Sequence, residues 1–121
     1  MWNGIAVSNK LLAENPQLVE RFLRGLAKGR EFARRYKDDT VSLISKRDPS
    51  PVDAIRVDYD VTKASMTEDG SLPDDVLREE AATRAELTKV ANPPNISALF
   101  DYSITRRNYA QLKATGWQPL R

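Results

Sequence analysis

A single apolar stripe along residues 16–37 constrains the fold of this chain more than any other feature. Asn15-Pro16 is typical of a helix start, because Asn caps the first turn and Pro needs no hydrogen-bond donor at the first helical position. Apolar residues then recur at steps of three and four, as on one face of a helix: Leu18, Val19, Phe22, Leu23, Leu26, Ala33 and Tyr36. A stripe of this length has to be buried against another layer of structure.

Two glycines interrupt the expected helix, at positions 25 and 29. Each lowers the helix propensity of the segment, so their presence needs a separate reason. We expect another backbone to approach the helix closely at this point.

Start and stop signals predict about five further helices. The signals are the cap Ser8 before 9–14, Asp38-Asp39 before 40–47, Ser50-Pro51 before 52–66, Pro73 before 74–91 and Asp101 before the last helix, which Gly116 ends. Residues 55–61 also alternate between apolar and polar side chains, as a strand does. A helix stripe fits the same segment, through Val52, Ile55, Tyr59, Thr62 and Met66, and the cap before it favours a helix. Residues 2–7 favour a short strand. The expected fold is therefore mainly α, with about six helices and one short N-terminal strand.

The absence of two residue types excludes several kinds of chemistry. The chain has 121 residues, which suits one domain, and it contains neither cysteine nor histidine. Disulfides, thiolate or imidazole metal sites and Ser-His-Asp or Cys-His catalysis cannot be built from it. The acidic pairs Asp74/Asp75 and Glu79/Glu80 are expected to be solvated near a helix start, and residues 67–71 to form a turn. We therefore expect no enzyme activity, no cofactor and no metal site.

Charge is divided into three blocks along the chain. Residues 1–47 hold ten basic and five acidic side chains, residues 48–91 hold five and eleven, and residues 92–121 hold four and one. Such blocks either steer a charged ligand or pair with one another, and pairing is the commoner case. No apolar run approaches the roughly 20 residues of a membrane span, and residues 1–10 do not form a signal peptide.

The order of these features resembles a known family. An apolar strand enters residues 7–35, which hold Leu12-Ala13-Glu14-Asn15-Pro16 and the Val19/Phe22/Leu23 stripe. A helix after a Pro, "TEDGSLPDDVL" and "ISALFDYSITRRNYAQL" follow. This order is similar to the C-terminal part of substrate-binding proteins of ABC importers in the nitrate, sulfonate and taurine class, which includes thiamine-pyrimidine binders. The resemblance extends over nearly the whole chain.

The resemblance implies a larger parent with a two-lobed α/β periplasmic-binding-protein fold, of which this chain is a C-terminal fragment. Residues 1–7 would be a strand entering from the hinge or first lobe, and residues 8–121 the C-terminal helical segment. The parent would capture a small organic anion or heterocycle in the periplasm and present it to a membrane permease. In the fragment, Trp2, Asn3 and Gly4 are the candidate ligand contacts, although they also suit an ordinary strand end.

Burial of the long stripe leads to a further expectation, a homodimer through Ile5, Val7, Phe22 and Leu26. The alternative is a stand-alone helical module that binds nucleic acid or another protein, with Arg34-Arg35 and Arg106-Arg107 as its basic groups. The acidic middle block and the lack of a helix-turn-helix pattern argue against nucleic acid as a partner.

Overall fold

The computed structural model describes residues 4–91 and 95–120, and all regular structure within them is helical. Seven helices lie in this part of the chain: α1 (Asn9–Glu14), α2 (Pro16–Arg35), α3 (Lys37–Ser45), α4 (Val52–Ser65), α5 (Asp74–Thr88), α6 (Ile96–Leu99) and α7 (Ser103–Ala114). The expectation of a mainly helical chain is confirmed, with α6 as the helix that the sequence signals missed.

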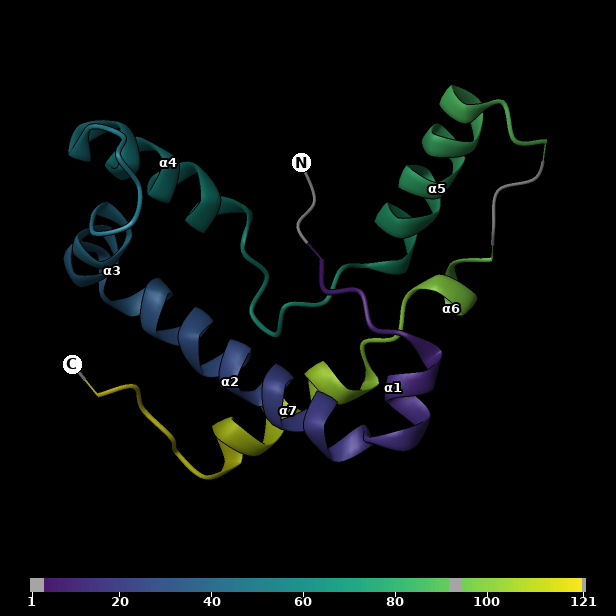
Figure 1. The fold of residues 1–121 in the computed structure, drawn as a ribbon, viewed down its shortest axis with the longest axis horizontal. Helices are drawn as coiled ribbons and strands as arrows, with labels where there is room; N and C mark the ends of the chain where they lie inside the picture. Colours follow the sequence, from purple (N-terminus) through teal and green to yellow (C-terminus); the bar gives the residue numbers. More distant parts are fainter. Residues whose placement is uncertain (1–3, 92–94, 121) are drawn as a thin grey trace.

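The helices form an open, U-shaped arrangement with α2 along its base (Figure 1). Helix α7 packs along α2, and α1 contacts the start of α2. At the other end of α2 the chain turns into α3 and α4, which form one arm, while α5 rises on the opposite side as a second arm. Long-range packing is therefore concentrated on α2.

Local signals explain where α1 and α2 begin. The Ser8 hydroxyl accepts a hydrogen bond from the Leu11 N–H at 3.1 Å, which caps α1 as expected. Pro16 occupies the first position of α2, but the Asn15 side chain makes no capping bond. Helix α2 ends at Arg35, two residues before the predicted end.

The main buried cluster lies between α3 and α4. Val41, Ile55 and Tyr59 form it, and each is at most 6% exposed. The Tyr59 hydroxyl donates a hydrogen bond to the Ala33 carbonyl of α2 at 2.5 Å, so the cluster is tied to the end of the long helix. Because residues 52–65 form a helix, the helical interpretation of the alternating segment is confirmed.

The last three helices follow their capping chemistry. Pro73 precedes α5 and Asp74 and Asp75 lie in its first turn, where the helix dipole favours acids. The Asn95 side chain accepts a hydrogen bond from the Ser97 N–H at 3.0 Å and so starts α6. After α7, Gly116 adopts a φ of +61°, and the Trp117 N–H donates to the Leu112 carbonyl at 3.1 Å, which closes a Schellman motif.

The predicted N-terminal strand is wrong. Residues 4–7 are irregular, and no strand exists elsewhere in the described ranges to pair with them. Because a strand needs the hydrogen bonds of a neighbouring strand, β propensity alone cannot form one. The expected fragment of a two-lobed α/β fold is likewise not found, since the described residues contain no sheet.

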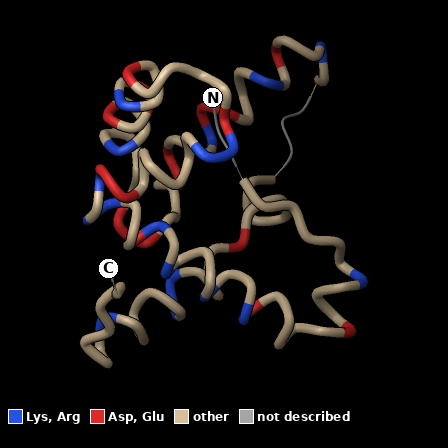
Figure 2. The backbone as a smooth tube through the Cα atoms, turned by 60° about the vertical axis from the view of Figure 1, so that its left-hand side comes forward, with Lys and Arg blue, Asp and Glu red and all other residues tan. Residues whose placement is uncertain are grey.

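Ion pairs join the three charge blocks, as the pairing interpretation predicts. Lys37 Nζ lies 2.7 Å from Asp60, and Arg106 Nε lies 3.9 Å from Asp69. Figure 2 shows basic and acidic positions following each other along the helices. Exposed pairs of this kind each stabilise a protein by less than about 1 kcal/mol, so they orient the helices more than they hold them.

Candidate functional site

The sequence-predicted ligand contacts do not form a site in the described part of the chain. Trp2 and Asn3 lie outside the described residues. Gly4 is exposed, and no atom beyond its chain neighbours lies within 4 Å of a Cβ built on it. The assignment of these three residues therefore stays a prediction.

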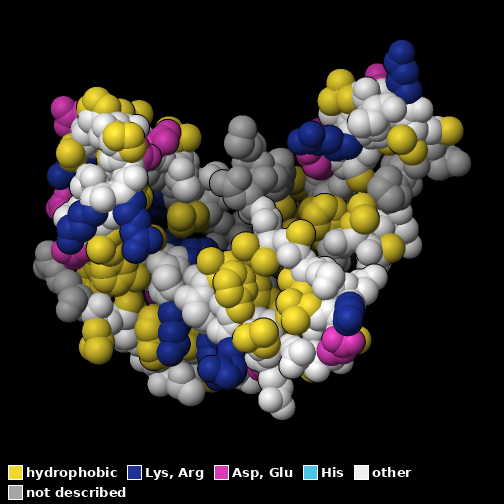
Figure 3. Space-filling view, viewed as in Figure 1, with side chains coloured by type: hydrophobic (Ala, Val, Ile, Leu, Met, Phe, Trp, Pro, Cys, Tyr) yellow, Lys and Arg dark blue, Asp and Glu magenta, His cyan; other side chains and the backbone are white. Residues whose placement is uncertain are grey.

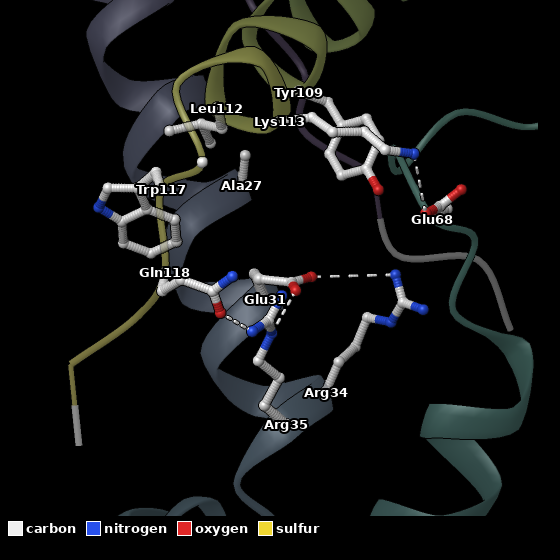
Figure 4. Close-up of a pocket in the computed structure, with 11 residues that line it drawn as sticks. Ala27, Glu31, Arg34, Arg35, Glu68, Tyr109, Leu112, Lys113, Trp117 and Gln118 are labelled. Atoms are coloured by element: carbon white, nitrogen blue, oxygen red, sulfur yellow. Dashed lines mark hydrogen bonds and ion pairs between the residues drawn. The ribbon is translucent and has the colours of Figure 1, made fainter.

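A pocket of about 220 Å³ lies between α2, α7 and the loop that follows α4 (Figure 4). Helix α2 contributes charged side chains, α7 and the segment after it contribute Tyr109 and Trp117, and the loop contributes Glu68. The Trp117 ring is covered by Lys28, whose Nζ lies 5.1 Å from the ring centroid. The pocket thus combines aromatic walls with several charges.

Glu31 pairs with both arginines on the α2 side of this pocket. Its carboxylate lies 2.5 Å from Arg35 Nε and 4.0 Å from Arg34 Nη1. Arg35 also donates a hydrogen bond to the Gln118 side chain, as Figure 4 shows. One carboxylate therefore orients both guanidinium groups.

On the loop side of the pocket, Glu68 is the carboxylate that pairs with the neighbouring groups. The Tyr109 hydroxyl donates a hydrogen bond to its carboxylate, and Lys113 Nζ lies 3.7 Å away. The hydrogen bond with Tyr109 and the nearby Lys113 charge lower the pKa of Glu68. The same hydrogen bond raises the pKa of Tyr109 to about 12, because losing the proton would place two negative charges together.

These contacts make the pocket a polar junction between the loop and the body of the molecule. Its three cations face two carboxylates, so a ligand anion would have to displace an existing partner. Within residues 4–91 and 95–120 no group of three or more acidic side chains is placed to hold a metal ion. Each of the three cations that line the pocket therefore already has a carboxylate partner.

The basic pairs considered for nucleic acid binding are also engaged. Arg106 Nε lies 3.4 Å from the Ser71 hydroxyl, and Arg107 Nη2 lies 3.6 Å from Glu20. With Arg34 and Arg35 directed at Glu31, the four arginines point at acidic or polar partners on different elements. This arrangement does not form one basic surface.

Exposed apolar side chains are the more informative feature of this chain. They reach the surface in several groups, one of them over α1 and α7 (Figure 3). Of the four residues predicted to form a dimer contact, Ile5, Phe22 and Leu26 are about half exposed or more, at 52%, 53% and 47%, and Val7 is half-buried.

One exposed group lies on α2 and is called here the α2 open face. At steps of three and four, its members share one side of the helix: Leu18, Phe22, Gly25, Leu26 and Gly29. No atom lies within 4 Å of a Cβ built on either glycine. The expected close approach of another backbone is therefore not made within the described residues.

A second group lies on α4 and is called here the α4 outer face. It consists of Ala54, Val57, Val61 and Ala64, which also recur at steps of three and four and are all exposed. Val57 and Val61 are 65% and 67% exposed. The sequence analysis did not predict this face. Val57 and Val61 are the apolar residues of the helix that do not belong to the stripe through Ile55 and Tyr59.

No helix among the described residues is long and apolar enough to cross a membrane. No protein-family model, curated protein or solved structure matches this chain.

Proposed function

We propose that this chain is a helical part of the solute-binding component of an ABC importer, and that the remainder of that protein covers its N-terminal segment and α1. The parent captures a small organic anion or heterocycle in the periplasm and delivers it to a membrane permease. The proposal starts from the family resemblance of residues 7–35, above all of Leu12 to Pro16.

The observation that carries the proposal is the state of α1. This helix has six residues and buries none of them. Helices shorter than about 12–15 residues are marginal in water by themselves, and the contact of α1 with the start of α2 buries none of its residues, so α1 needs further packing. Its apolar residues Leu11 and Leu12 and the preceding Ile5 are exposed, and a further body seated here would bury them together.

The experiment begins with the gene. We expect the reading frame to continue upstream of Met1 and to encode the remaining solute-binding protein. The encoded long protein should be stabilised by one solute in a thermal-shift screen of nitrate, sulfonates and pyrimidines. A ligand at 100 times its Kd stabilises the protein by about 2.7 kcal/mol.

A matched pair of variants tests the contact itself. Leu12 is 37% exposed in the 121-residue chain, so a body seated on it would bury only about the last third of its surface. Leu12→Asn should therefore lower the stability of the long protein by about 0.5–1 kcal/mol more than that of the 121-residue chain, a third of the usual worth of a fully buried leucine. Lys10→Asn is the control, because the Lys10 side chain is 81% exposed. A reading frame that starts at Met1 would overturn the proposal.

A further inference from the structure

The α2 open face carries a basic edge. Arg21 lies four residues before Gly25 and is a neighbour of the face on the helix surface, and Lys28, whose Nζ lies over the Trp117 ring, follows Gly25 by three residues on the same side. None of the five residues of the face is acidic, and Arg21 is exposed. The face is thus an apolar strip with two bare glycine positions and positive charge beside it.

The α4 outer face carries acidic edges. Asp53 lies four residues before Val57, and Asp58 lies three residues before Val61 on the other side of the strip. Both aspartates are exposed. This face is therefore an apolar strip of complementary charge, with protruding valines in place of glycines.

The two faces cannot meet within one chain. Ile55 and Tyr59, on the opposite side of α4, are buried, and Tyr59 bonds to Ala33 near the C-terminal end of α2. The buried side of α4 thus faces the molecule, and its outer face is directed to solvent. Only another molecule can bring an α4 outer face to an α2 open face.

We propose that two copies of this chain form a dimer in which the α2 open face of each copy packs against the α4 outer face of the other. Under a two-fold axis the α2–α4 contact forms twice, since α2 of the first copy meets α4 of the second and α4 of the first copy meets α2 of the second. Val57 and Val61 form a ridge that fits the groove left by Gly25 and Gly29. The basic edge of α2 lies against the acidic edges of α4 and fixes the register.

This inference does not rest on the proposed function, since the ABC-importer parent is proposed to cover the N-terminal segment and α1. The proposed interface also gives Phe22 and Leu26, two residues of the predicted homodimer contact, a partner surface on the other copy. Ile5 and Val7 of the predicted homodimer contact are not part of this interface.

Complementation between two variants tests the pairing. Phe22→Asp places a negative charge opposite the acidic edges of α4, and Val61→Arg places a positive charge opposite the basic edge of α2. We expect multi-angle light scattering to show a dimer for the unchanged chain and a monomer for each variant alone. Mixing the variants should restore a dimer, because one intact α2 face then meets one intact α4 face. Leu87→Arg, at a side chain 73% exposed on α5, should remain a dimer.

The remaining outcomes of this experiment overturn the proposal. A chain that is monomeric at every concentration has no such interface. If the mixed variants stay monomeric while the unchanged chain is a dimer, the α2 open face of one copy does not meet the α4 outer face of the other. If either variant alone remains a dimer, its face does not take part. Circular dichroism of each variant confirms that the helices are retained.

A glycine variant supplies a readout that a folding defect does not mimic. Gly25→Ala should raise the Tm of the dilute monomer, because alanine favours the helix and its Cβ meets no other atom. In the dimer the same methyl group occupies the groove, so the dimer Kd should rise about tenfold, which corresponds to a 1.4 kcal/mol loss. An unchanged or lower Kd would contradict the close approach of α4.

Discussion

The polar contacts of the α3–α4 arm join distant residues, whereas those of the α5 arm stay within one helix, which also buries Leu77, Ala81 and Ala85. In the α3–α4 arm, Lys37 pairs with Asp60 on the neighbouring helix, and Tyr59 bonds to Ala33, 26 residues away. In α5, the ion pairs that the structure describes are Arg78–Asp74 and Arg84–Glu80, each within one turn of the same helix.

This difference teaches where the molecule should open first. Contacts between distant residues make two helices unfold together, whereas contacts within one turn support only that turn. Regions with few long-range contacts open at a lower free energy than the core. We therefore expect α3 and α4 to unfold with α2, and α5 to open separately.

The largest expected effect tests the α3–α4 side of this comparison. Tyr59→Ala removes a buried ring and its bond to Ala33, and should cost about 3–5 kcal/mol of stability, as large-to-small core substitutions do. Leu87→Ala on α5 should change stability by no more than about 0.5 kcal/mol, because that side chain is 73% exposed. Urea unfolding followed by circular dichroism measures both at concentrations where the chain is monomeric. Equal losses would contradict the placement of Tyr59 in the buried cluster and of Leu87 at the surface.

A smaller effect is expected where α7 joins α2. Asn108 is fully buried, donates to the Glu20 carbonyl at 3.1 Å and accepts from Arg24 Nε at 3.3 Å. Asn108→Ala leaves these groups without their partner and should cost about 1–3 kcal/mol. Gln111→Ala, which removes an exposed partner of the same arginine, is the control and should cost less. The same urea titration compares them, and equal losses would contradict the role of the buried amide.

The sequence predicted most helices because helix signals are local. The stripe after Pro16, the acids after Pro73 and Gly116 at the last helix end all act through neighbours within a turn. Helix α6 was not predicted because its four residues are too few to show a helical hydrophobic period. The Asn95 cap is its only sequence signal.

Features that depend on distant partners could not be predicted in this way. The strand over 2–7 failed because propensity does not supply a neighbouring strand. The polar junction around Glu68 and Tyr109 joins residues 41 positions apart, and no local pattern marks such a pair. The α4 outer face went unnoticed because the stripe through Ile55 and Tyr59 already accounted for the helix.

The smallest expected effect lies at the root of the α5 arm, where Glu68 meets Tyr109. The pKa of Tyr109 is raised from 10.0 to about 12, so protonated Tyr109 is favoured in the folded state. The stability this gives is complete below about pH 10 and is lost as the pH rises through about 12. Glu68→Gln removes the carboxylate and should return the pKa of Tyr109 toward its ordinary value. Ultraviolet absorbance of tyrosinate follows the titration, with Glu80→Gln on α5 as the control.

Because water screens an exposed carboxylate, the change in stability should be much smaller than for Tyr59→Ala or Asn108→Ala. The position of residue 68 is more informative than the size of the stability change, since residue 68 lies in the loop that leads into α5. If the bond to Tyr109 anchors this loop, Glu68→Gln should speed amide hydrogen exchange in residues 66–73 and leave α3 and α4 unchanged. Faster exchange in α3 and α4 as well would mean that the two arms open together, and that their different contacts do not separate them.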